Sequence, residues 1–485
     1  MNLGQLLKDL IVIQEEWQGT EISSIETDSR RAHSGALFVC LKGPKQDGHA
    51  FVNDAIQKGC RAILVDPAHA SNLTLTGVCL LAHADPVKIL PVLLNRLHHQ
   101  PCETVHVIGI TGTNGKTTTT YLVEAIYESA GRRCGVIGTV NYRFAGKVLA
   151  AKNTTPGVVD NFSHLSQMRE AGMEACVMEV SSHALVQRRV AGLCFQEAVF
   201  TNLTSDHLDY HETQEDYFLA KALLFDGSYE VRQAIINIDD PFGPRLTKMS
   251  AVPVITYGIA AEADIRAVQM KMDLSGSRFD LVTPQGMIAM TTPLMGKHNV
   301  YNILAAAGIS LNEGFSLKDI QQGVAQLAGV PGRLERIDQG QPFSVFVDYA
   351  HTEDALQNVL MSIRELKPSR ILVLFGCGGD RDKIKRPKMA AVVERYADVA
   401  IVTNDNPRTE DPQAIVEDIK RGFQKTNYEV VLDRELAIQK ILNSAGPGDC
   451  VLIAGKGHED YQIFKDRTIH FDDREICRFI LKGLR

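Results

Sequence analysis

The stretch TGTNGKTTT, residues 111–119, decides how this chain is organised. It follows VHVIGI (residues 105–110), a short run rich in β-branched residues that predicts a buried strand, and it leads into residues 121–129, whose apolar spacing predicts a helix. Glycines between a strand and a helix let backbone N–H groups turn toward an anion, and the start of the helix adds its positive dipole end. Lys116 can then reach a terminal phosphate and the Thr117 hydroxyl can bind Mg²⁺, so the stretch predicts a site for ATP.

One position departs from the usual phosphate-loop pattern. Ile110 stands five residues before Gly115, where glycine is usual, and Gly112 lies inside the loop instead. An ordinary glycine turn is the alternative, but it does not account for Gly-Lys-Thr at the start of the helix. The residues expected to bind ATP are Gly112, Thr113, Asn114, Gly115, Lys116, Thr117 and Thr118.

The composition is that of a mildly acidic protein. Its 485 residues exceed what one hydrophobic core usually supports, so two or three domains are expected. The formal net charge is -7 and no basic tract is present, which argues against nucleic acid as a partner. Asp9 lies where a signal peptide needs apolar residues, and no apolar run is long enough to cross a bilayer. We therefore expect a cytoplasmic chain that does not insert into membranes, with its ten cysteines as reduced core thiols.

Three α/β domains are predicted. Residues 1–102 are expected to form a small N-terminal α/β domain, residues 103–328 a central domain with a P-loop ATPase-like parallel sheet, and residues 329–485 a C-terminal domain with a Rossmann-like doubly wound sheet. The last boundary follows from the Gly- and Pro-marked break GVPGR at residues 329–333. Expected strands of the first domain are 36–41, 61–65 and 77–81, with a helix at 51–58, and those of the last are 344–347, 371–375, 399–403, 429–432 and 450–454.

Two polar loops stand out in the N-terminal domain. TDSR at residues 27–30 and GPKQDGH at residues 43–49 are rich in turn residues and lie next to predicted strands, which suits contact with a ligand. Surface loops with capping residues are an equally good interpretation from the residues alone.

Acids and hydroxyls follow two strands of the central domain. Glu179 ends the apolar run 176–180, and DHLDYH (residues 206–211) follows the run 198–203. Because ligands lie beyond the carboxyl ends of parallel strands, Glu179, His207 and the glycine loop are expected to converge on Mg²⁺ and ATP. Taken alone, His207 and His211 suit a helix start or a core role better than metal binding. Lys221 lies in an apolar helical run, where it is either a snorkelling side chain or a functional amine with a lowered pKa.

Four polar loops follow the strands of the C-terminal domain. They are DYAH at 348–351, GCGGDR at 376–381, NDNPR at 404–408 and GKGHE at 455–459. All four fall on the carboxyl edge of the sheet and predict a pocket for a polar ligand. The loops contribute Arg381, Asp405, Arg408 and Glu459, so the ligand is expected to carry both carboxylate and ammonium groups.

Together these motifs resemble the Mur ligase family, which builds the peptide of bacterial cell-wall precursors. The resemblance covers nearly the whole chain, and the matching motifs occur in the family's order: GTNGKTT at 112–118, NTTP at 153–156, EVSSH at 179–183, TNL at 201–203, DHLDYH at 206–211, HNVYN at 298–302, GR at 332–333 and DYAH at 348–351. DNPR at 405–408 resembles the recognition motif of the members that add meso-diaminopimelate to UDP-N-acetylmuramoyl-L-alanyl-D-glutamate. One departure is Glu353, which follows Thr352 where the family more often has proline.

The resemblance implies an ATP-dependent ligase that works through an acyl phosphate, with Lys116, His207 and Lys221 as catalytic residues. ATP would phosphorylate the D-glutamate carboxylate, and the amine of the incoming amino acid would displace the phosphate. Metal ligands for Mg²⁺ would be Thr117, Glu179, His207 and Lys221, the last as a carbamate. Further nucleotide contacts would be Asn299, Arg333 and Asp348. The uridine-linked substrate would meet Thr27, Ser29, Asn153, Thr154, Thr155, Ser181, Gln187 and Arg189. The amino acid would meet Arg381, Asp405, Asn406, Pro407, Arg408, Gly455 and Glu459.

Arg408 bears on the choice of amino acid. Meso-diaminopimelate differs from lysine by one carboxylate, which a guanidinium pairs with, whereas the guanidinium repels a lysine ammonium. The alternatives are the same ligase chemistry with L-lysine, a folate ligase, and a regulatory protein that binds nucleotide without turnover. The chain is expected to be a monomer.

Overall fold

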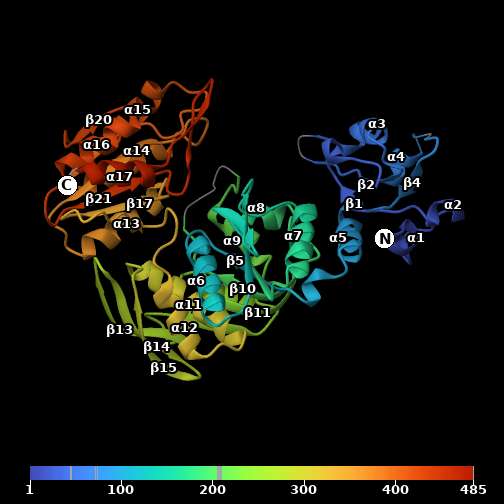
Figure 1. Cartoon of the computed structure of the whole chain (residues 1–485), viewed down its shortest axis with the longest axis horizontal. Coiled ribbons are helices and arrows are strands. Elements are labelled where there is room, and N and C mark those ends of the chain that lie inside the picture. Colours follow the sequence, from blue (N-terminus) through green and yellow to red (C-terminus); the bar gives the residue numbers. More distant parts are fainter. Residues whose placement is uncertain (44–45, 72, 74, 205–209, 484–485) are drawn as a thin grey trace.

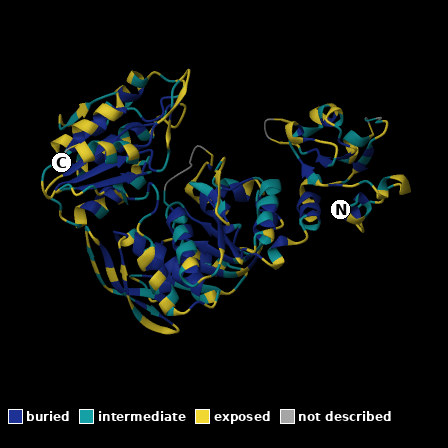
Figure 2. Cartoon of the chain, viewed as in Figure 1, coloured by how far each residue is buried: buried dark blue, intermediate teal, exposed yellow. Residues whose placement is uncertain are grey.

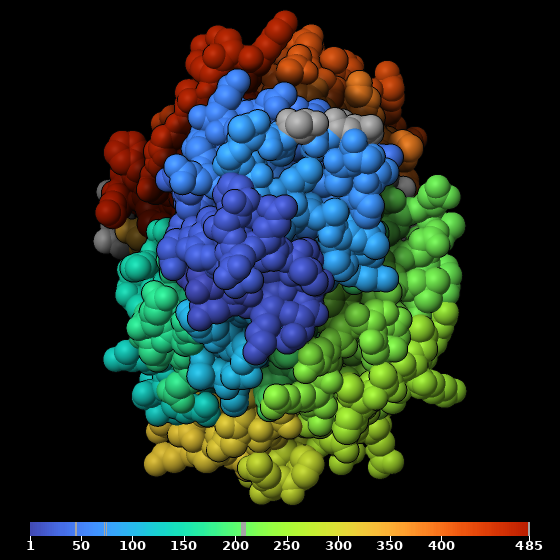
Figure 3. Space-filling model, turned by 90° about the vertical axis from the view of Figure 1, so that its right-hand side faces the viewer, coloured from blue at the N-terminus to red at the C-terminus, as the bar shows by residue number. Residues whose placement is uncertain are grey.

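The computed structural model describes residues 1–43, 46–71, 73, 75–204 and 210–483. The chain forms three α/β units in sequence order, the N-terminal unit around strands β1 to β4, the central unit around β5 to β15 and the C-terminal unit around β16 to β21 (Figure 1). Figure 3 shows the blue N-terminal unit in front, with the green part of the central unit below it. Within the described ranges, no helix has both the length and the apolar character needed to span a membrane.

The N-terminal unit has a four-stranded sheet in the order β1-β2-β3-β4, with parallel pairing throughout. Its strands are β1 (Ser24–Glu26), β2 (Ala36–Val39), β3 (Ala62–Val65) and β4 (Cys79–Ala82). Its helices are α1 (Leu3–Leu7), α2 (Glu15–Gln18), η1 (Ser29–Arg31), η2 (Gly48–Phe51), α3 (Val52–Gln57), α4 (Pro67–Ala70) and α5 (Pro86–Leu97). The strand expected at residues 77–81 begins only at Cys79, because Gly77 has a φ of 72°, a turn conformation that a strand does not contain.

The central unit has an eleven-stranded sheet in the order β15-β14-β13-β12-β11-β10-β5-β9-β6-β7-β8. Its strands are β5 (His106–Thr111), β6 (Cys134–Ile137), β7 (Asn141–Phe144), β8 (Lys147–Ala150), β9 (Ala175–Glu179), β10 (Cys194–Phe200), β11 (Glu230–Asn237), β12 (Val254–Gly258), β13 (Ile265–Asp273), β14 (Gly276–Thr283) and β15 (Gly286–Thr292). From β6 to β13 the pairing is parallel, as predicted. Both edges are antiparallel, through β7 and β8 at one side and β14 and β15 at the other, which the prediction did not include.

Helices cover both faces of the central sheet because alternate strand residues point to opposite faces. On β9, Val177 packs in the cluster formed with α6 (Lys116–Ser129), whereas Met178 packs in the cluster formed with α7 (Val158–Glu170). The second cluster also includes α5, so the N-terminal and central units share one apolar core. The other helices are η3 (Pro101–Glu103), α8 (Ser182–Val186), α9 (Gln214–Ala222), α10 (Gly243–Met249), α11 (Lys297–Asn312) and α12 (Leu317–Gln326).

The C-terminal unit is doubly wound, with the strand order β16-β17-β21-β18-β19-β20. Its strands are β16 (Glu335–Arg336), β17 (Ser344–Asp348), β18 (Ile371–Phe375), β19 (Val399–Val402), β20 (Tyr428–Val430) and β21 (Cys450–Ala454), and β22 (Tyr461–Ile463) pairs with β23 (Thr468–His470) beside the sheet. All neighbours in the sheet are parallel except β16, which is antiparallel to β17. The buried strands lie inside the layer of partly exposed helices in Figure 2.

The two faces of the C-terminal sheet bury different helices. On β18, Val373 packs with α13 (Glu353–Glu365), α14 (Lys385–Tyr396) and α15 (Pro412–Lys420). Its neighbour Leu374 packs with α16 (Arg434–Ser444) and α17 (Asp473–Gly483) on the opposite face. Because β17, β21, β18, β19 and β20 are parallel, they end at the same edge of the sheet, where the polar loops begin.

Candidate active site

The glycine loop between β5 and α6 is held by close contacts that only glycine permits. Gly112 has a φ of 144°, and a Cβ there would lie 1.9 Å from Thr201 Oγ1. Gly115 has a φ of 90°, and a Cβ there would lie 2.3 Å from Asn302 Oδ1. Lys116 Nζ donates to the carbonyls of Gly112 and Thr113, each at 2.8 Å. The lysine therefore lies folded over the loop at the start of α6.

The Glu179 carboxylate accepts hydrogen bonds from hydroxyl and backbone N–H donors next to this loop. It lies at the end of β9 with 1% of its surface exposed, and Thr117 Oγ1 donates to its Oε1 at 3.0 Å. Thr139 donates to the same carboxylate from its backbone N at 2.8 Å and from its hydroxyl at 2.9 Å. A buried carboxylate beside a threonine hydroxyl is an all-oxygen donor set, which fits Mg²⁺.

Lys221 is buried directly behind the loop. It lies on α9 with 1% of its surface exposed, and its Nζ donates to Gly112 O at 3.0 Å and lies 4.3 Å from the centre of the Tyr217 ring. His207, the predicted partner of Lys221 in metal binding, lies outside the described residues. His211, from the same motif, is buried, with its Nε2 2.9 Å from the Ser182 hydroxyl.

A cavity of about 630 Å³ opens between the central and C-terminal units. It is lined by the loop from Thr113 to Thr118, by Glu179, and by the three further residues expected to bind nucleotide, Asn299, Arg333 and Asp348. Arg333 NH2 donates to Thr117 Oγ1 at 3.2 Å, so a residue of the C-terminal unit reaches the phosphate loop. The structure thus brings residues that were predicted to bind nucleotide from two units to one cavity.

Asp348 is a buried acceptor at the far wall of this cavity. It accepts hydrogen bonds from the backbone N of Leu334 at 2.6 Å and of Ala350 at 2.7 Å. Burial raises the pKa of its carboxyl, and the charge of Arg333 acts in the opposite direction.

The sequence interpretation missed Asp239 and Tyr301, whose side chains also line the cavity and are joined by a 2.7 Å hydrogen bond. Asp239 follows β11. Ligands lie beyond the carboxyl ends of parallel strands, so the reasoning that led to Glu179 could also have led to Asp239.

The residues expected to meet the uridine-linked substrate form two groups. Arg189 NH1 donates to Thr155 O at 3.0 Å, and its NH2 donates to Gln187 Oε1 at 2.7 Å. Thr155 Oγ1 accepts from Ser181 N at 3.0 Å. Thr154 lies beside Thr139, with 3.1 Å between their hydroxyls, and the backbone of Asn153 contacts the Tyr142 hydroxyl. These six predicted residues are therefore neighbours on the central unit.

Thr27 and Ser29 belong instead to the N-terminal unit (Figure 1). Ser29 begins η1 and is buried, and its carbonyl accepts from Lys58 Nζ at 2.8 Å. Two residues further along, Arg31 forms a 2.7 Å ion pair with Asp160 of α7. The η1 turn therefore lies next to the central unit.

Three of the polar loops of the C-terminal unit converge as predicted from strand order. Asn406 Nδ2 donates to Glu459 Oε2 at 2.8 Å, and Arg408 NH1 donates to Gly379 O at 2.8 Å. A Cβ on Gly455 would lie 2.7 Å from Asp405 Oδ2, so these two loops touch. Burial raises the pKa of the Glu459 carboxyl, and the Asp405 charge adds to that effect.

Arg381 and Pro407, which were also predicted to meet the amino acid, lie in the same loop cluster. Arg381 is exposed, and a Cβ on Gly378 would lie 3.8 Å from its Cγ and 2.8 Å from Arg408 NH1. Pro407 packs its carbonyl 1.9 Å from where a Cβ on Gly379 would stand. Lys456 was not predicted, yet its side chain is fully buried and lies 3.3 Å from Glu459 Oε2. Its position inside the polar loop 455–459 could have identified Lys456 as a candidate site residue.

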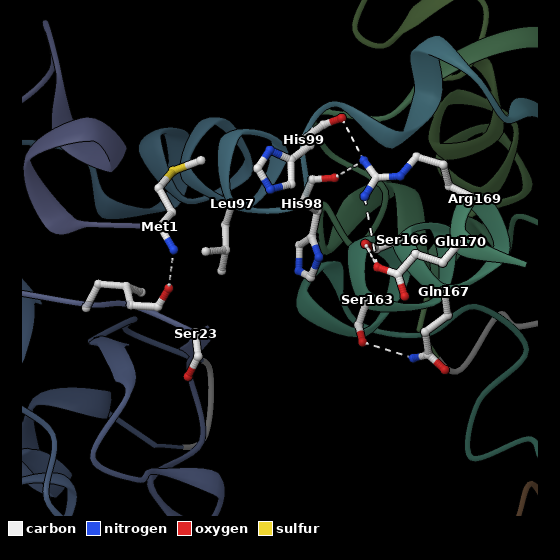
Figure 4. Close-up of a pocket in the computed structure, with 11 residues that line it drawn as sticks. Met1, Ser23, Leu97, His98, His99, Ser163, Ser166, Gln167, Arg169 and Glu170 are labelled. Carbon is white, nitrogen blue, oxygen red and sulfur yellow. Dashed lines mark hydrogen bonds and ion pairs between the residues drawn. The ribbon is translucent and has the colours of Figure 1, made fainter.

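A second cavity, of about 360 Å³, lies between the N-terminal and central units. The linker between α5 and η3 contains His98 and His99. Figure 4 shows Arg169 of α7 pointing toward this linker, where its NH1 donates to the carbonyls of His98 at 2.7 Å and His99 at 2.9 Å. His99 has a φ of 54°, which marks a sharp turn in the linker. As far as the structure describes the chain, this cavity is not lined by any residue predicted to bind substrate or nucleotide.

Three family models match the chain in order. They are "Mur ligase family, catalytic domain" over residues 21–94, "Mur ligase middle domain" over residues 110–310 and "Mur ligase, glutamate ligase domain" over residues 332–457.

Full-length relatives agree with these matches. A protein of Geobacillus thermodenitrificans named UDP-N-acetylmuramoyl-L-alanyl-D-glutamate--2,6-diaminopimelate ligase is 45% identical, with 96% of each chain covered. A protein of Clostridium botulinum with the same name is 40% identical over 100% of both chains. A solved structure of a ligase with that name is 32% identical with a TM-score of 0.73, covering 100% of this chain and 99% of the other. MurF from Acinetobacter baumannii, at 19% identity and a TM-score of 0.69 over 99% and 98% of the two chains, shares the fold. The chain therefore belongs to the Mur ligase family.

Proposed function

We propose that this protein is an ATP-dependent ligase that joins meso-diaminopimelate to the D-glutamate of UDP-N-acetylmuramoyl-L-alanyl-D-glutamate, in the synthesis of peptidoglycan precursors. The observation that carries the proposal is the convergence of Asp405, Asn406, Arg408 and Glu459 on the carboxyl edge of the C-terminal sheet. A ligand with two ammonium and two carboxylate groups suits a site with both acids and a guanidinium. The names of the relatives support the same substrates.

The first step is proposed to take place at the glycine loop. ATP transfers its terminal phosphoryl group to the D-glutamate carboxylate, and two negatively charged groups must approach each other for this to happen. Lys116, which lies over the loop carbonyls, is proposed to turn to the phosphate and offset that repulsion. Thr117 and Glu179 would hold Mg²⁺, which supplies further positive charge to the phosphates.

The second step is proposed to use the C-terminal unit. The incoming amine attacks the carbonyl carbon of the acyl phosphate, the C–N bond forms, phosphate leaves with the electrons of the C–O bond, and the amine loses a proton. Asp405, Glu459 and Asn406 are proposed to orient the amino acid, and Arg408 to bind its distal carboxylate. Lys221, as a carbamate, and His207 are proposed to hold a second Mg²⁺.

The remaining assignments are proposals of the same kind. Residues 1–102, 103–328 and 329–485 are proposed as the three domains, with the uridine-linked substrate bound between the first two. The chain is proposed to act as a cytoplasmic monomer without nucleic acid. All ten cysteines are free thiols, which supports a reducing compartment.

The test is phosphate release from ATP with the uridine-linked dipeptide present, comparing meso-diaminopimelate with L-lysine. We expect release with diaminopimelate only, and in the same assay Arg408→Ala should raise the KM for diaminopimelate by about 10-fold to 100-fold, since a charge-assisted pair contributes about 1.5–3 kcal/mol. Release with lysine would support the alternative amino acid. Silence with both would reopen the folate and regulatory alternatives.

A further inference from the structure

Two histidines and two aspartates form a cluster in the N-terminal unit, away from the glycine loop. Asp47 and His49 lie at η2, after β2, and Asp66 and His69 lie at α4, after β3. Because β2 and β3 are parallel neighbours, the two segments meet at the same edge of the sheet. The proposed ligase reaction uses none of these four side chains.

Each histidine is oriented by its own aspartate. His49 Nδ1 lies 2.6 Å from Asp47 Oδ1, and His69 Nδ1 lies 2.9 Å from Asp66 Oδ2. The two imidazole rings are stacked, with centroids 3.7 Å apart and planes inclined by 12°. Two imidazolium ions in face-to-face contact would repel each other, whereas two neutral rings that share a metal ion would not.

The other nitrogen of His49 faces an anionic oxygen without a hydrogen bond. The His49 side chain is 7% exposed, and its Nε2 has no hydrogen-bond partner among the residues that the structure describes. Asp66 Oδ2 lies 3.5 Å away, which is too long for a good N–H···O bond. A histidine that donates its Nδ1 proton to a carboxylate can offer the lone pair of its Nε2 to a cation. The buried Nε2 of His49 is therefore available as a ligand.

The carboxylates are charged at neutral pH. Hydrogen bonding to His69 is the largest effect that lowers the pKa of Asp66, and hydrogen bonding to His49 is the largest that lowers the pKa of Asp47. A histidine that donates one N–H to a carboxylate and presents its other nitrogen is the arrangement found in metal sites, where the carboxylate fixes the ring. A cation between Nε2 and Asp66 Oδ2 would be bound by both atoms, which lie 3.5 Å apart.

We propose that His49, His69 and Asp66 bind a divalent transition-metal ion of the zinc class, with Asp47 orienting His49 or joining as a fourth ligand. In a tetrahedral zinc site with bond lengths of about 2.0–2.2 Å, neighbouring ligand atoms lie about 3.4 Å apart, and the observed span between Nε2 and Oδ2 is 3.5 Å. Ligand atoms of Asp47, His49 and His69 all lie within 4.8 Å of one another, and Asp66 contacts both histidines, so the four side chains surround one small space. Mixed imidazole and carboxylate ligands favour zinc over Mg²⁺.

Bound metal would join the loop after β2 to the loop after β3. The Asp47, Asp66 and His69 side chains are 37%, 31% and 42% exposed, so an ion can enter from solvent. The metal would stabilise the N-terminal unit against unfolding and take no part in phosphoryl transfer.

The experiment is a zinc titration of the full-length chain, freed of metal beforehand, against a chromophoric chelator. The active-site acids can bind zinc too, so the readout is the difference in stoichiometry between variants. We expect His49→Ala and the near-isosteric Asp66→Asn to lose one equivalent of zinc and to lose the zinc-dependent rise in the midpoint of thermal unfolding. His33→Ala is the matched control, because His33 is a histidine of the same unit that contacts Ser24, and it should retain that equivalent.

Either of two results would overturn the proposal. One is an unchanged zinc stoichiometry in both folded variants, with circular dichroism used to verify folding. The other is a nitrogen-15 NMR spectrum of the metal-free protein in which His49 carries protons on both ring nitrogens at neutral pH and does not shift when zinc is added. In that case a proton, and not a metal, occupies the position between His49 and Asp66.

Discussion

Glu197 is a buried acid on β10, in register with Ile108 of β5. It accepts a hydrogen bond from Asn312 Nδ2 at 2.5 Å. Burial raises its pKa to about 9, with the neighbouring Glu313 charge as the next contribution. Glu313 in turn accepts from His106 at 3.0 Å and from Tyr127 at 2.9 Å. Glu197 is therefore protonated in the folded chain at neutral pH.

This pKa predicts how stability changes with pH. The folded-state pKa is above the unfolded value of about 4.5, so the stabilisation is complete below about pH 4.5 and is lost as the pH rises toward about 9. We expect Glu197→Gln to gain stability relative to wild type between about pH 6 and about pH 8.5, by up to about 1.4 kcal/mol per pH unit. Thermal unfolding across that range is the measurement, with Glu215→Gln, an exposed acid paired with Arg245, as the control. A difference between variant and wild type that does not change with pH would contradict the prediction.

The start of α16 connects two loops of the proposed amino-acid site. Arg434 is fully buried and forms a bidentate pair with Asp473 of α17, at 2.8 and 2.7 Å. Its remaining N–H groups donate to Asn404 O and Ala454 O, each at 3.1 Å. These carbonyls directly precede Asp405 and Gly455. We conclude that one guanidinium sets the spacing of the loops after β19 and β21.

A double substitution separates this positioning from simple stability. Replacing a buried ion pair by apolar residues of similar volume is often neutral for folding, so Arg434→Met combined with Asp473→Leu should unfold near the wild-type temperature. The KM for meso-diaminopimelate should nevertheless rise about 10-fold, because misplaced loops orient the substrate poorly, while the KM for ATP stays near its original value. Replacing Arg370 and Asp449, an ion pair at the opposite edge of the same sheet, is the control. Equal rises in both KM values would indicate a general disturbance instead.

At the scale of the whole molecule, the central and C-terminal units meet through apolar packing, which includes Met295, and through polar contacts around the 630 Å³ cavity. Arg333 NH2 reaches Thr117 at 3.2 Å, and the Ser362 hydroxyl lies 3.3 Å from His298 Nδ1. The Arg333 guanidinium also stacks on Tyr349, 4.8 Å from the ring centre. Bound nucleotide is proposed to strengthen this junction because it would contact both units at once.

Arg333 should therefore contribute to nucleotide affinity from outside the ATP-binding unit. We expect Arg333→Ala to raise the Kd for a non-hydrolysable ATP analogue by about 10-fold to 100-fold, since hydrogen bonds to charged groups contribute about 1.5–3 kcal/mol. Arg333→Lys should restore little, because lysine lacks the planar group that stacks on Tyr349. Calorimetric titration checks both variants, and Arg336→Ala, an exposed arginine of β16, serves as control. Unchanged affinity in Arg333→Ala would exclude a role for Arg333 in ATP binding.

The sequence by itself determined what depends on neighbours along the chain. The glycine loop, the strand that ends at Glu179 and the five C-terminal strands follow from local spacing, because strand burial and turn chemistry act over a few residues. Parallel strands end at one edge, so the meeting of the loops at Asn406 and Glu459 was predictable as well.

Only the tertiary structure decided contacts between residues that are distant in sequence and have no motif of their own. The antiparallel edges of the central sheet, the buried Lys456 and the reach of Arg434 to two loops depend on how layers pack. The approach of His49 to Asp66 likewise arises because β2 and β3 are neighbours in the sheet. The physical reason is that burial and hydrogen-bond geometry are properties of the packed chain, whereas spacing along the sequence specifies only the elements that pack.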